Sequence, residues 1–406
     1  MAIQPDEREL KKQQLKDRVL RDPLPEDIVR EEKRIRLRRI RRILVVLLVL
    51  AIAAGAFVIV RYIDKNRLCS TYQTVWQEPF DAARGEMVNF EGGVLRVTKN
   101  GIKYMDKEGV VLWDQGANMN NPRLMVREHY ALAADLGGRN AWLIKKTGAA
   151  LISTDSPIIG AGVSDYGVTA LMVSEGSYSK VFFYDNVCRR LDIEVKNAIN
   201  DENGVPISLA LAPDGQGLAF SMVSVTDGTV DTWLTFMNLD TSNTGTDKVV
   251  GAFKYPEALF PQVEYLSQKA VCAFGDTGME FYSLSDASAP KLVTSVSYEK
   301  KVKSAFTALG EACIICENEN GNDELIFYDA DGDKGLSYEL DFAYSEITCG
   351  NGFLLIYSED RCLIVGEGGQ LVYNGSFDGN TYQMVVTDLH TLLQVGDYGM
   401  REVKLK

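Results

Sequence analysis

Residues 104–113, YMDKEGVVLW, have the pattern of a β-hairpin, in which apolar residues lead into Asp-Lys-Glu-Gly and an apolar run follows. Asp and Gly are typical of the tight turns that join neighbouring strands. The same pattern recurs six times along the chain. The recurrences start at Ala141, Lys180, Thr232, Met279, Glu324 and Cys362. The chain is therefore expected to repeat one small β unit.

A further turn and apolar strand precede each of these hairpins, and the combination occurs once more near the carboxyl end. These segments start at Gly92, His129, Tyr166, Gly215, Gln268, Gly310, Gly350 and Leu389. Repeats of about 40 residues with four strands each are typical of β-propellers, whose blades stack in a ring because no blade buries both faces alone. The sequence predicts an all-β, eight-bladed β-propeller, with seven blades as the alternative.

The ends of the repeat region predict how the ring closes. The eighth unit has strands near residues 383–387, 389–395 and 401–406, and it lacks a fourth. Residues 71–77, TYQTVWQ, form a spare strand before the first unit. Pairing this strand with residues 401–406 completes the eighth blade and removes two open sheet edges. The longest loops are expected near Asn243 and Ala258.

Residues 43–60, ILVVLLVLAIAAGAFVIV, contain no charge and are long enough to cross most of a bilayer. Seven positive charges lie in the ten residues 33–42, and positive flanks stay in the cytoplasm. This pattern predicts a single-pass protein of the cell membrane with a cytoplasmic basic tail (1–42), a transmembrane helix (43–63) and an extracytoplasmic propeller (64–406). A buried core helix and a cleaved signal peptide are the alternatives.

The tail is expected to contain two helices. The first spans residues 5–21, Pro23 and Pro25 interrupt the pattern, and the second runs from Glu26 into the membrane segment. Its basic residues beside the bilayer would attract anionic lipid headgroups. Residues 1–42 carry a net charge of +5 and the remainder −18. So acidic a body argues against a nucleic-acid partner, because phosphate binding needs a basic face.

Two repeat motifs resemble known propeller families. DKEGVVLW, residues 106–113, resembles the repeat of quinoprotein-like propellers, and LALAPDGQGLAF, residues 209–220, resembles the Pro-Asp-Gly repeat of WD40-like periplasmic propellers. The layout of residues 70–406 behind an anchor resembles a family of uncharacterised single-pass propeller proteins of Gram-positive bacteria. The resemblance implies a fold and does not specify an activity.

Motifs that would support catalysis are sparse. The adjacent cysteine pair of quinoprotein dehydrogenases and a complete Ser-x-Asp-x-Gly-x-x-Trp box of sialidases do not occur in the sequence. His129 and His390 are expected at comparable turns of two different blades, as structural or exposed residues rather than metal ligands or proton carriers. We therefore expect neither an enzyme nor a bound cofactor.

The acidic loop DADGDKG, residues 329–335, is the one weak candidate for a metal site. Asp329, Asp331 and Asp333 alternate in a way that could converge on Ca²⁺. An EF-hand loop would need Gly at Lys334 and Glu at Leu340, so a plain hairpin turn is the preferred interpretation.

The seven cysteines do not suggest a disulfide framework. Cys313 and Cys316 are expected on opposite faces of one strand, because side chains alternate along a strand. Cys272 and Cys349 are expected in the core, and Cys69 is expected to be the most exposed thiol.

Together these features favour a membrane-anchored scaffold that binds a protein or glycan of the cell envelope. A sensor that couples an external ligand to a cytoplasmic partner is the alternative. An enzyme with its site on the central axis is a further alternative, although no set of residues nominates it.

Overall fold

The computed structural model describes residues 7–19, 25–80, 83, 85–200, 204–226, 228–240, 248–350 and 352–406. The chain forms two compact units, Met1–Arg67 and Leu68–Lys406. Each unit is described by itself. Asn243, near which a long loop is expected, lies outside the described residues, as do the predicted ends of the first helix, Pro5 and Arg21.

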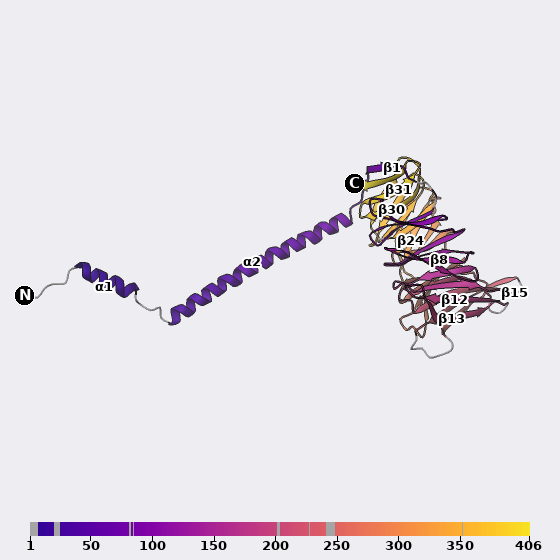
Figure 1. Cartoon of the computed structure of the whole chain (residues 1–406), viewed down its shortest axis with the longest axis horizontal. Helices are drawn as coiled ribbons and strands as arrows, with labels where there is room; N and C mark the ends of the chain where they lie inside the picture. The colour runs from indigo at the N-terminus through magenta and orange to yellow at the C-terminus, as the bar shows by residue number, and fades with distance from the viewer. Residues whose placement is uncertain are drawn as a thin grey trace, which may run out of the picture. The chain divides into compact units, whose positions relative to one another are not determined.

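The described residues of the first unit form two helices, α1 (Glu7–Val19) and α2 (Pro25–Lys65) (Figure 1). The prediction of a second helix that runs from Glu26 through the apolar segment is confirmed. Residues 26–65 contain no proline, so nothing in the sequence removes a backbone donor from the helix. Lys33–Lys65 is long and apolar enough to cross a membrane, a property that a signal sequence near the amino terminus shares.

Strands in the described part of the second unit form eight antiparallel four-stranded sheets, so the eight-bladed propeller is confirmed. Blade 1 contains β2 (Gly85–Phe90), β3 (Gly93–Thr98), β4 (Gly101–Met105) and β5 (Val111–Gly116). Blade 2 contains β6 (Pro122–Val126), β7 (Ala131–Asp135), β8 (Asn140–Lys145) and β9 (Gly148–Ser153). Blade 3 contains β10 (Ile158–Val163), β11 (Thr169–Ser174), β12 (Tyr178–Tyr184) and β13 (Arg190–Ala198). Blade 4 contains β14 (Val205–Leu211), β15 (Gly217–Thr226), β16 (Thr229–Asn238) and β17 (Val249–Tyr255). Blade 5 contains β18 (Gln262–Ser267), β19 (Ala270–Phe274), β20 (Gly278–Ser283) and β21 (Lys291–Ser297). Blade 6 contains β22 (Val302–Ala308), β23 (Glu311–Glu317), β24 (Asp323–Tyr328) and β25 (Lys334–Leu340). Blade 7 contains β26 (Glu346–Gly350), β27 (Phe353–Tyr357), β28 (Arg361–Gly366) and β29 (Leu371–Ser376). Blade 8 contains β30 (Thr381–Asp388), β31 (Thr391–Gly396), β32 (Gly399–Leu405) and β1 (Tyr72–Glu78).

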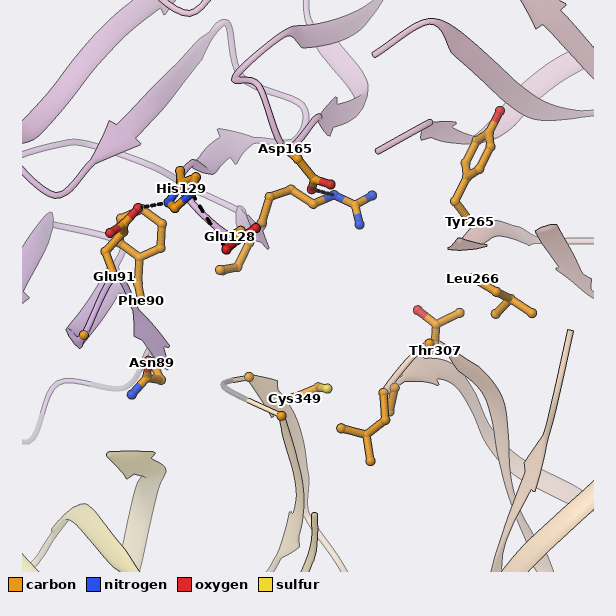
Figure 2. Close-up of a pocket in the computed structure, with 18 residues that line it drawn as sticks. Asn89, Phe90, Glu91, Glu128, His129, Asp165, Tyr265, Leu266, Thr307 and Cys349 are labelled. Atoms are coloured by element: carbon orange, nitrogen blue, oxygen red, sulfur yellow. Dashed lines mark hydrogen bonds and ion pairs between the residues drawn. The ribbon is translucent and has the colours of Figure 1, made fainter. Parts of the chain in front are cut away.

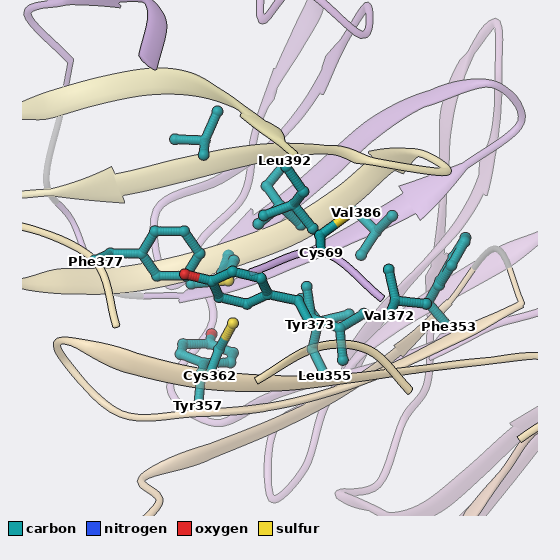
Figure 3. Packing of buried hydrophobic residues seen from close by; sticks show 14 residues of the cluster. Cys69, Phe353, Leu355, Tyr357, Cys362, Val372, Tyr373, Phe377, Val386 and Leu392 are labelled. Carbon is teal, nitrogen blue, oxygen red and sulfur yellow. The ribbon is translucent and has the colours of Figure 1, made fainter. Parts of the chain in front are cut away.

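The core lies between the blades. Second strands such as β7, β19 and β27 are buried along their whole length, because each is covered by a neighbouring blade on both faces. The described buried residues form eight clusters, one for each interface between adjacent blades. Figure 3 shows the cluster between blades 7 and 8, in which Tyr373 and Phe377 stack with ring centroids 5.2 Å apart.

The predicted closure is confirmed. β1 pairs antiparallel with β32, with Tyr72 opposite Leu405 and Glu78 opposite Met400. Figure 1 shows β1, from the start of the unit, beside the yellow carboxyl-terminal strands. The indole Nε1 of Trp76 donates a hydrogen bond of 2.6 Å to Glu402 Oε2. The first and last strands of the propeller therefore share one blade, as the strand count predicts.

The expectation of an exposed Cys69 thiol is wrong. Only 1% of Cys69 is exposed, and the residue belongs to the cluster of Figure 3. Its backbone amide donates to the carbonyl of Val372 at 2.8 Å, and the residue forms a parallel bridge with Tyr373. The segment before β1 is thus packed against blade 7 rather than extended as a free linker, which buries the thiol.

The eighth blade is set back from the central channel. Its inner strand β30 is almost fully buried, and β2 packs against both β30 and β26. Side-chain amides hold this arrangement: Asn89 Nδ2 donates to the carbonyl of Val386 at 3.3 Å, and Gln383 Nε2 donates to the carbonyl of Gly85. In the described part of the chain, the inner strands of the other seven blades line the channel.

Candidate functional site

One face of the propeller opens into a recess of about 800 Å³ over the central channel (Figure 2). The recess is formed by the inner strands and the turns that join first to second strands, from blades 1, 2, 3, 5, 6 and 7. The residues that line it are 89–92, 126–129, 165, 265–266, 307–310, 349–350 and 352. Because every blade runs antiparallel, the turns between second and third strands lie on the opposite face.

Two of these turns have the geometry of tight hairpins. Glu91 and Gly92 have φ angles of 49° and 76°, and Leu309 and Gly310 have φ angles of 57° and 82°. Two consecutive residues with positive φ match the right-handed twist of the flanking strands in a two-residue hairpin. Glu91 is a non-glycine residue with a positive φ, which is uncommon, and it lies at the rim of the recess.

His129 lies at this rim between two carboxylates. Its Nδ1 contacts Glu91 Oε1, and its Nε2 lies 3.8 Å from Glu128 Oε1 (Figure 2). The hydrogen bond with Glu91 raises the pKa of His129 above its ordinary value of 6.5, with further contributions from the charges of Glu91, Glu128 and Asp165. The group therefore gains a proton more readily than a free imidazole does.

Arg127 is held between the rim and the interior. Its Nε donates to the carbonyl of Val163 at 3.1 Å and lies 4.0 Å from Asp165 Oδ1, and its Nη2 donates to the carbonyl of Leu211 at 3.4 Å. Burial raises the pKa of Asp165, and the Arg127 charge offsets only part of that effect. The guanidinium is thus engaged by protein acceptors from two neighbouring blades.

Below the recess lies a second cavity of about 700 Å³ in the interior of the channel. Glu86 on β2, Glu264 on β18 and Glu346 on β26 line it together with Arg123 on β6. Burial raises the pKa of Glu86 and of Glu264, and the charges of Arg123 and Arg127 less than offset this effect. Each of these two carboxyl groups therefore keeps its proton to a higher pH than a free glutamic acid does.

The acidic loop forms a turn between β24 and β25. Asp329 Oδ1 accepts the backbone amides of Asp331 and Asp333 at 2.9 and 3.0 Å. Asp106 and Asp185 accept backbone amides in the same way in blades 1 and 3. Within the described residues, no three His, Cys, Asp or Glu side chains are grouped so that they could hold a metal ion. Asp329 thus has the same role as its counterparts in the sister blades.

The two histidines lie in comparable first turns, as predicted, but only His129 reaches the recess. His390 lies in the turn between β30 and β31 of the set-back blade, and it is not among the residues that line either cavity. The structure therefore does not bring the two histidines into one site.

The cysteine predictions are confirmed at three positions. Cys313 packs in the cluster between blades 6 and 7, Cys316 packs in the cluster between blades 5 and 6, and Cys272 is fully buried. The prediction of a core position for Cys349 is wrong, because this residue is exposed to the central channel from the inner strand β26. All seven cysteines are free thiols.

Sequence reasoning missed the charged lining of the channel. Arg123, Glu264 and Glu346 lie on first strands, which expose one side to the channel, whereas second strands are covered on both. The signal was present as a charged residue inside the short apolar segment that precedes the buried strand in several of the repeats, although β10 and β14 contain none. Comparing these segments across the repeats would have separated channel positions from loop positions.

Residues 65–405 match the model of a protein family described as "Family of unknown function (DUF5711)". The chain belongs to this family. The match covers the whole propeller of this DUF5711 protein. Membrane anchoring and an origin in Gram-positive bacteria, which the sequence resemblance implied, stay predictions. No curated protein matches the chain at a significant level.

Several solved propeller structures are similar to this DUF5711 chain. BamB from Moraxella catarrhalis is 12% identical, with 83% of this chain and 100% of that chain covered and a TM-score of 0.49. Apo AztD from Citrobacter koseri is 8% identical, with 74% and 88% covered and a TM-score of 0.46. Hsv2 from Kluyveromyces lactis is 10% identical, with 73% and 99% covered and a TM-score of 0.45. Similarity at this level says nothing about ligands or partners.

Proposed function

We propose that this protein is a membrane-anchored propeller that binds a partner protein of the cell envelope at the recess over its central channel. The recess is the observation that carries the proposal. It gathers turns or strand ends from six blades on one face, its rim carries charged side chains, and it shares lining residues with a second cavity. Rigid scaffolds that present loops from several repeats on one face are typical of binding modules.

The membrane anchor rests on α2. Its segment 43–60 has no charge, and seven Lys or Arg residues precede it within one continuous helix. Such a basic flank favours a cytoplasmic amino terminus, which places the propeller outside. The acidic propeller, with a net charge of −18 after residue 42, suits a protein partner better than an anionic polymer.

Topology can be tested by protease treatment of intact protoplasts that express the full chain with an amino-terminal epitope. We expect the propeller to be degraded from outside while the tagged tail and membrane segment survive. Detergent-permeabilised protoplasts serve as the control, because the tail then becomes accessible as well. A tail that is lost before the propeller in intact protoplasts would reverse the orientation.

The binding face can be tested by placing a photo-reactive phenylalanine at Tyr166 or at Glu319 in the full-length protein. Tyr166 is 67% exposed and adjoins Asp165 at the recess, whereas Glu319 is an exposed residue in a turn on the opposite face. We expect a discrete protein adduct from position 166 and none from position 319. Adducts at both positions or only at 319 contradict the proposed face, and adducts with polysaccharide at 166 point to a glycan instead.

A further inference from the structure

A smaller pocket opens on the same face as the recess, between blades 4 and 5. Its walls are the turns that join β14 to β15 and β18 to β19, together with the segments that follow β16 and β20. All of these lie on the recess face, because the first and third strands of an antiparallel blade run in the same direction. The pocket has a volume of about 240 Å³, whereas pockets for drug-sized ligands measure roughly 300–1,000 Å³. It therefore suits a single ring-sized group.

Tyr265 on β18 directs its hydroxyl at this pocket without a protein partner. The residue is 7% exposed, and its hydroxyl points away from the other side chains of the recess (Figure 2). A Cβ atom added at Gly217, in the pocket wall, would lie 2.7 Å from the hydroxyl oxygen. Within the described residues this hydroxyl forms no hydrogen bond, which is costly for a buried polar group and leaves it free for a ligand. Burial raises the pKa of Tyr265, and the charge of Asp214 adds to that effect, so the hydroxyl keeps its proton and can donate.

The other polar side chains of the pocket use one oxygen each to hold its turns. Asp214 Oδ1 accepts the backbone amide of Gln216 at 2.8 Å, and Gln268 Oε1 accepts the backbone amide of Asp214 at 3.0 Å. Asn238 Oδ1 accepts the backbone amide of Asp240 at 2.9 Å. In the part of the chain that the structure describes, the side-chain NH₂ groups of Asn238 and Gln268 and the whole side-chain amide of Gln216 have no partner. The pocket thus presents several uncharged donors and acceptors on turns that are themselves fixed.

These features together indicate the class of ligand. Met237 and Leu284 add an apolar wall to the polar groups, and an anion would face the charge of Asp214. The described residues contain no group of three His, Cys, Asp or Glu that could hold a metal ion. A peptide strand binds along an open sheet edge or in a long groove, whereas this pocket is bounded by turns of two blades. A sugar ring fits best, because its hydroxyls both donate and accept hydrogen bonds and its ring C–H groups are apolar.

We propose that the pocket between blades 4 and 5 binds one uncharged sugar residue of a glycan, with the Tyr265 hydroxyl and the amides of Gln216 and Gln268 as hydrogen-bond partners of its hydroxyls. Uncharged polar groups on the turns then select the ligand by the arrangement of its hydroxyls rather than by charge. This site goes beyond the proposed protein partner, since it lies beside the recess and uses different turns of blades 4 and 5.

Saturation-transfer NMR of the full-length protein, in a neutral detergent without a sugar headgroup, tests the proposal. The probes are glucose and N-acetylglucosamine as uncharged sugars, glucuronate as a charged sugar and trialanine as a peptide, each at millimolar concentration. We expect transfer to at least one of the two uncharged sugars and much less to glucuronate and trialanine. No transfer to either uncharged sugar, or equal transfer to glucuronate or trialanine, overturns the proposal.

Two matched variants locate the site. Tyr265→Phe removes a hydroxyl that no described residue pairs with, so the urea midpoint should not fall while sugar affinity drops by about tenfold. Tyr298→Phe is the control, because the Tyr298 hydroxyl is also buried without a partner but lines a separate cavity on the opposite face. Sugar affinity in Tyr298→Phe should equal that of the wild-type protein. Equal affinity in Tyr265→Phe and the wild-type protein overturns the proposal.

Gln216→Ala adds a second position in the same pocket. Its side chain is exposed and has no described partner, so the change should leave stability unaltered and weaken sugar binding about fivefold. Unchanged affinity in this variant and in Tyr265→Phe would place any sugar elsewhere. The protein adduct expected at position 166 forms whether or not a sugar binds, so failure of this proposal and failure of the proposed function are distinguishable.

Discussion

His129 stands at the rim of the channel, and its contact with Glu91 controls its proton affinity. We expect its pKa to lie above the ordinary 6.5 and to fall in Glu91→Gln, because the neutral amide no longer favours the imidazolium. A raised folded-state pKa means that the contact stabilises the fold below the unfolded-state pKa. This contribution is lost as the pH rises through the folded-state value. NMR titration of the ring protons measures the pKa of His129 in the wild-type protein and in Glu91→Gln.

The control for this titration is Glu128→Gln. The Nε2 of His129 lies 3.8 Å from Glu128, which is farther than a hydrogen bond, so this variant should lower the pKa less than Glu91→Gln. The sequence contains two histidines, and His390→Asn removes the second ring signal. Equal pKa values in the wild-type protein and Glu91→Gln would show that the contact has no effect on protonation.

Asp329 supports its turn through one carboxylate oxygen that accepts two backbone amides. Asp329→Ala should lower the free energy of unfolding by about 1 kcal/mol, whereas Asp329→Asn should cost much less because its amide oxygen also accepts. Urea unfolding followed by tryptophan fluorescence measures the difference. Millimolar calcium should leave the unfolding midpoint unchanged in all three proteins. A rise confined to the wild-type protein would instead establish a calcium site.

Single residues were predictable where their surroundings follow from strand alternation. Cys313 and Cys316 face opposite clusters because the side-chain period of a strand is two. Cys349 and Cys69 were misjudged because their exposure depends on long-range packing. One lies on a strand open to the channel, and the other lies in a segment that packs on blade 7. The local sequence pattern predicts neither the exposure of Cys349 nor the burial of Cys69.

The seam between β3 of blade 1 and β30 of blade 8 differs from an ordinary apolar interface. Arg96, which is 1% exposed, donates through Nε to Gln383 Oε1 at 3.1 Å and through Nη2 to the carbonyl of Ala83. Its guanidinium also lies 4.9 Å from the ring centroid of Phe80. The repeat pattern predicted these strands but not this polar seam, because Gln383 and Arg96 are distant in sequence.

Arg96→Ala should destabilise the propeller by about 3 kcal/mol, because it leaves buried acceptors unpaired and a void between the blades. Urea unfolding of the full-length protein in neutral detergent, followed by the four tryptophans at residues 76 to 233, reports the change. Arg139→Ala is the matched control, since Arg139 is an exposed residue and surface substitutions change stability by about 0.5 kcal/mol or less. Equal losses in the two variants would show that the buried seam is not stabilising.

At the scale of the whole molecule, the blade number and closure were predictable because both follow from counting apolar segments at a fixed period. The set-back position of blade 8 was not, since it depends on how β2 packs against two inner strands at once. This arrangement also determines which seven strands line the channel, and hence which charges meet there. The residues of the candidate site could therefore not be grouped from the sequence, because they meet only when the blades form the ring.

Closure makes the stability of each blade depend on the others. β1 pairs with β32 over residues 72–78, and the backbone of Lys406 exchanges hydrogen bonds with Thr71 and accepts one from the amide of Ser70. Deleting residues 400–406 removes β32, leaves β1 without a partner and exposes β31 as an open edge. It also removes Val403 and Leu405 from the cluster between blades 7 and 8, and Met400 from the cluster between blades 8 and 1.

The truncated protein should therefore unfold at a much lower urea concentration than the intact chain, with loss of signal from all four tryptophans together. Trp142 and Trp233 lie in blades 2 and 4, so their response reports blades that do not contact the deleted residues, whereas Trp113 lies in blade 1, which Met400 contacts. Lys404→Ala, on the exposed side of the same strand, should leave the midpoint unchanged. If only Trp76 changes in the truncated protein while the other three unfold at the wild-type midpoint, the blades are stable one by one. The pairing of β1 with β32 would then close the ring without stabilising the other blades.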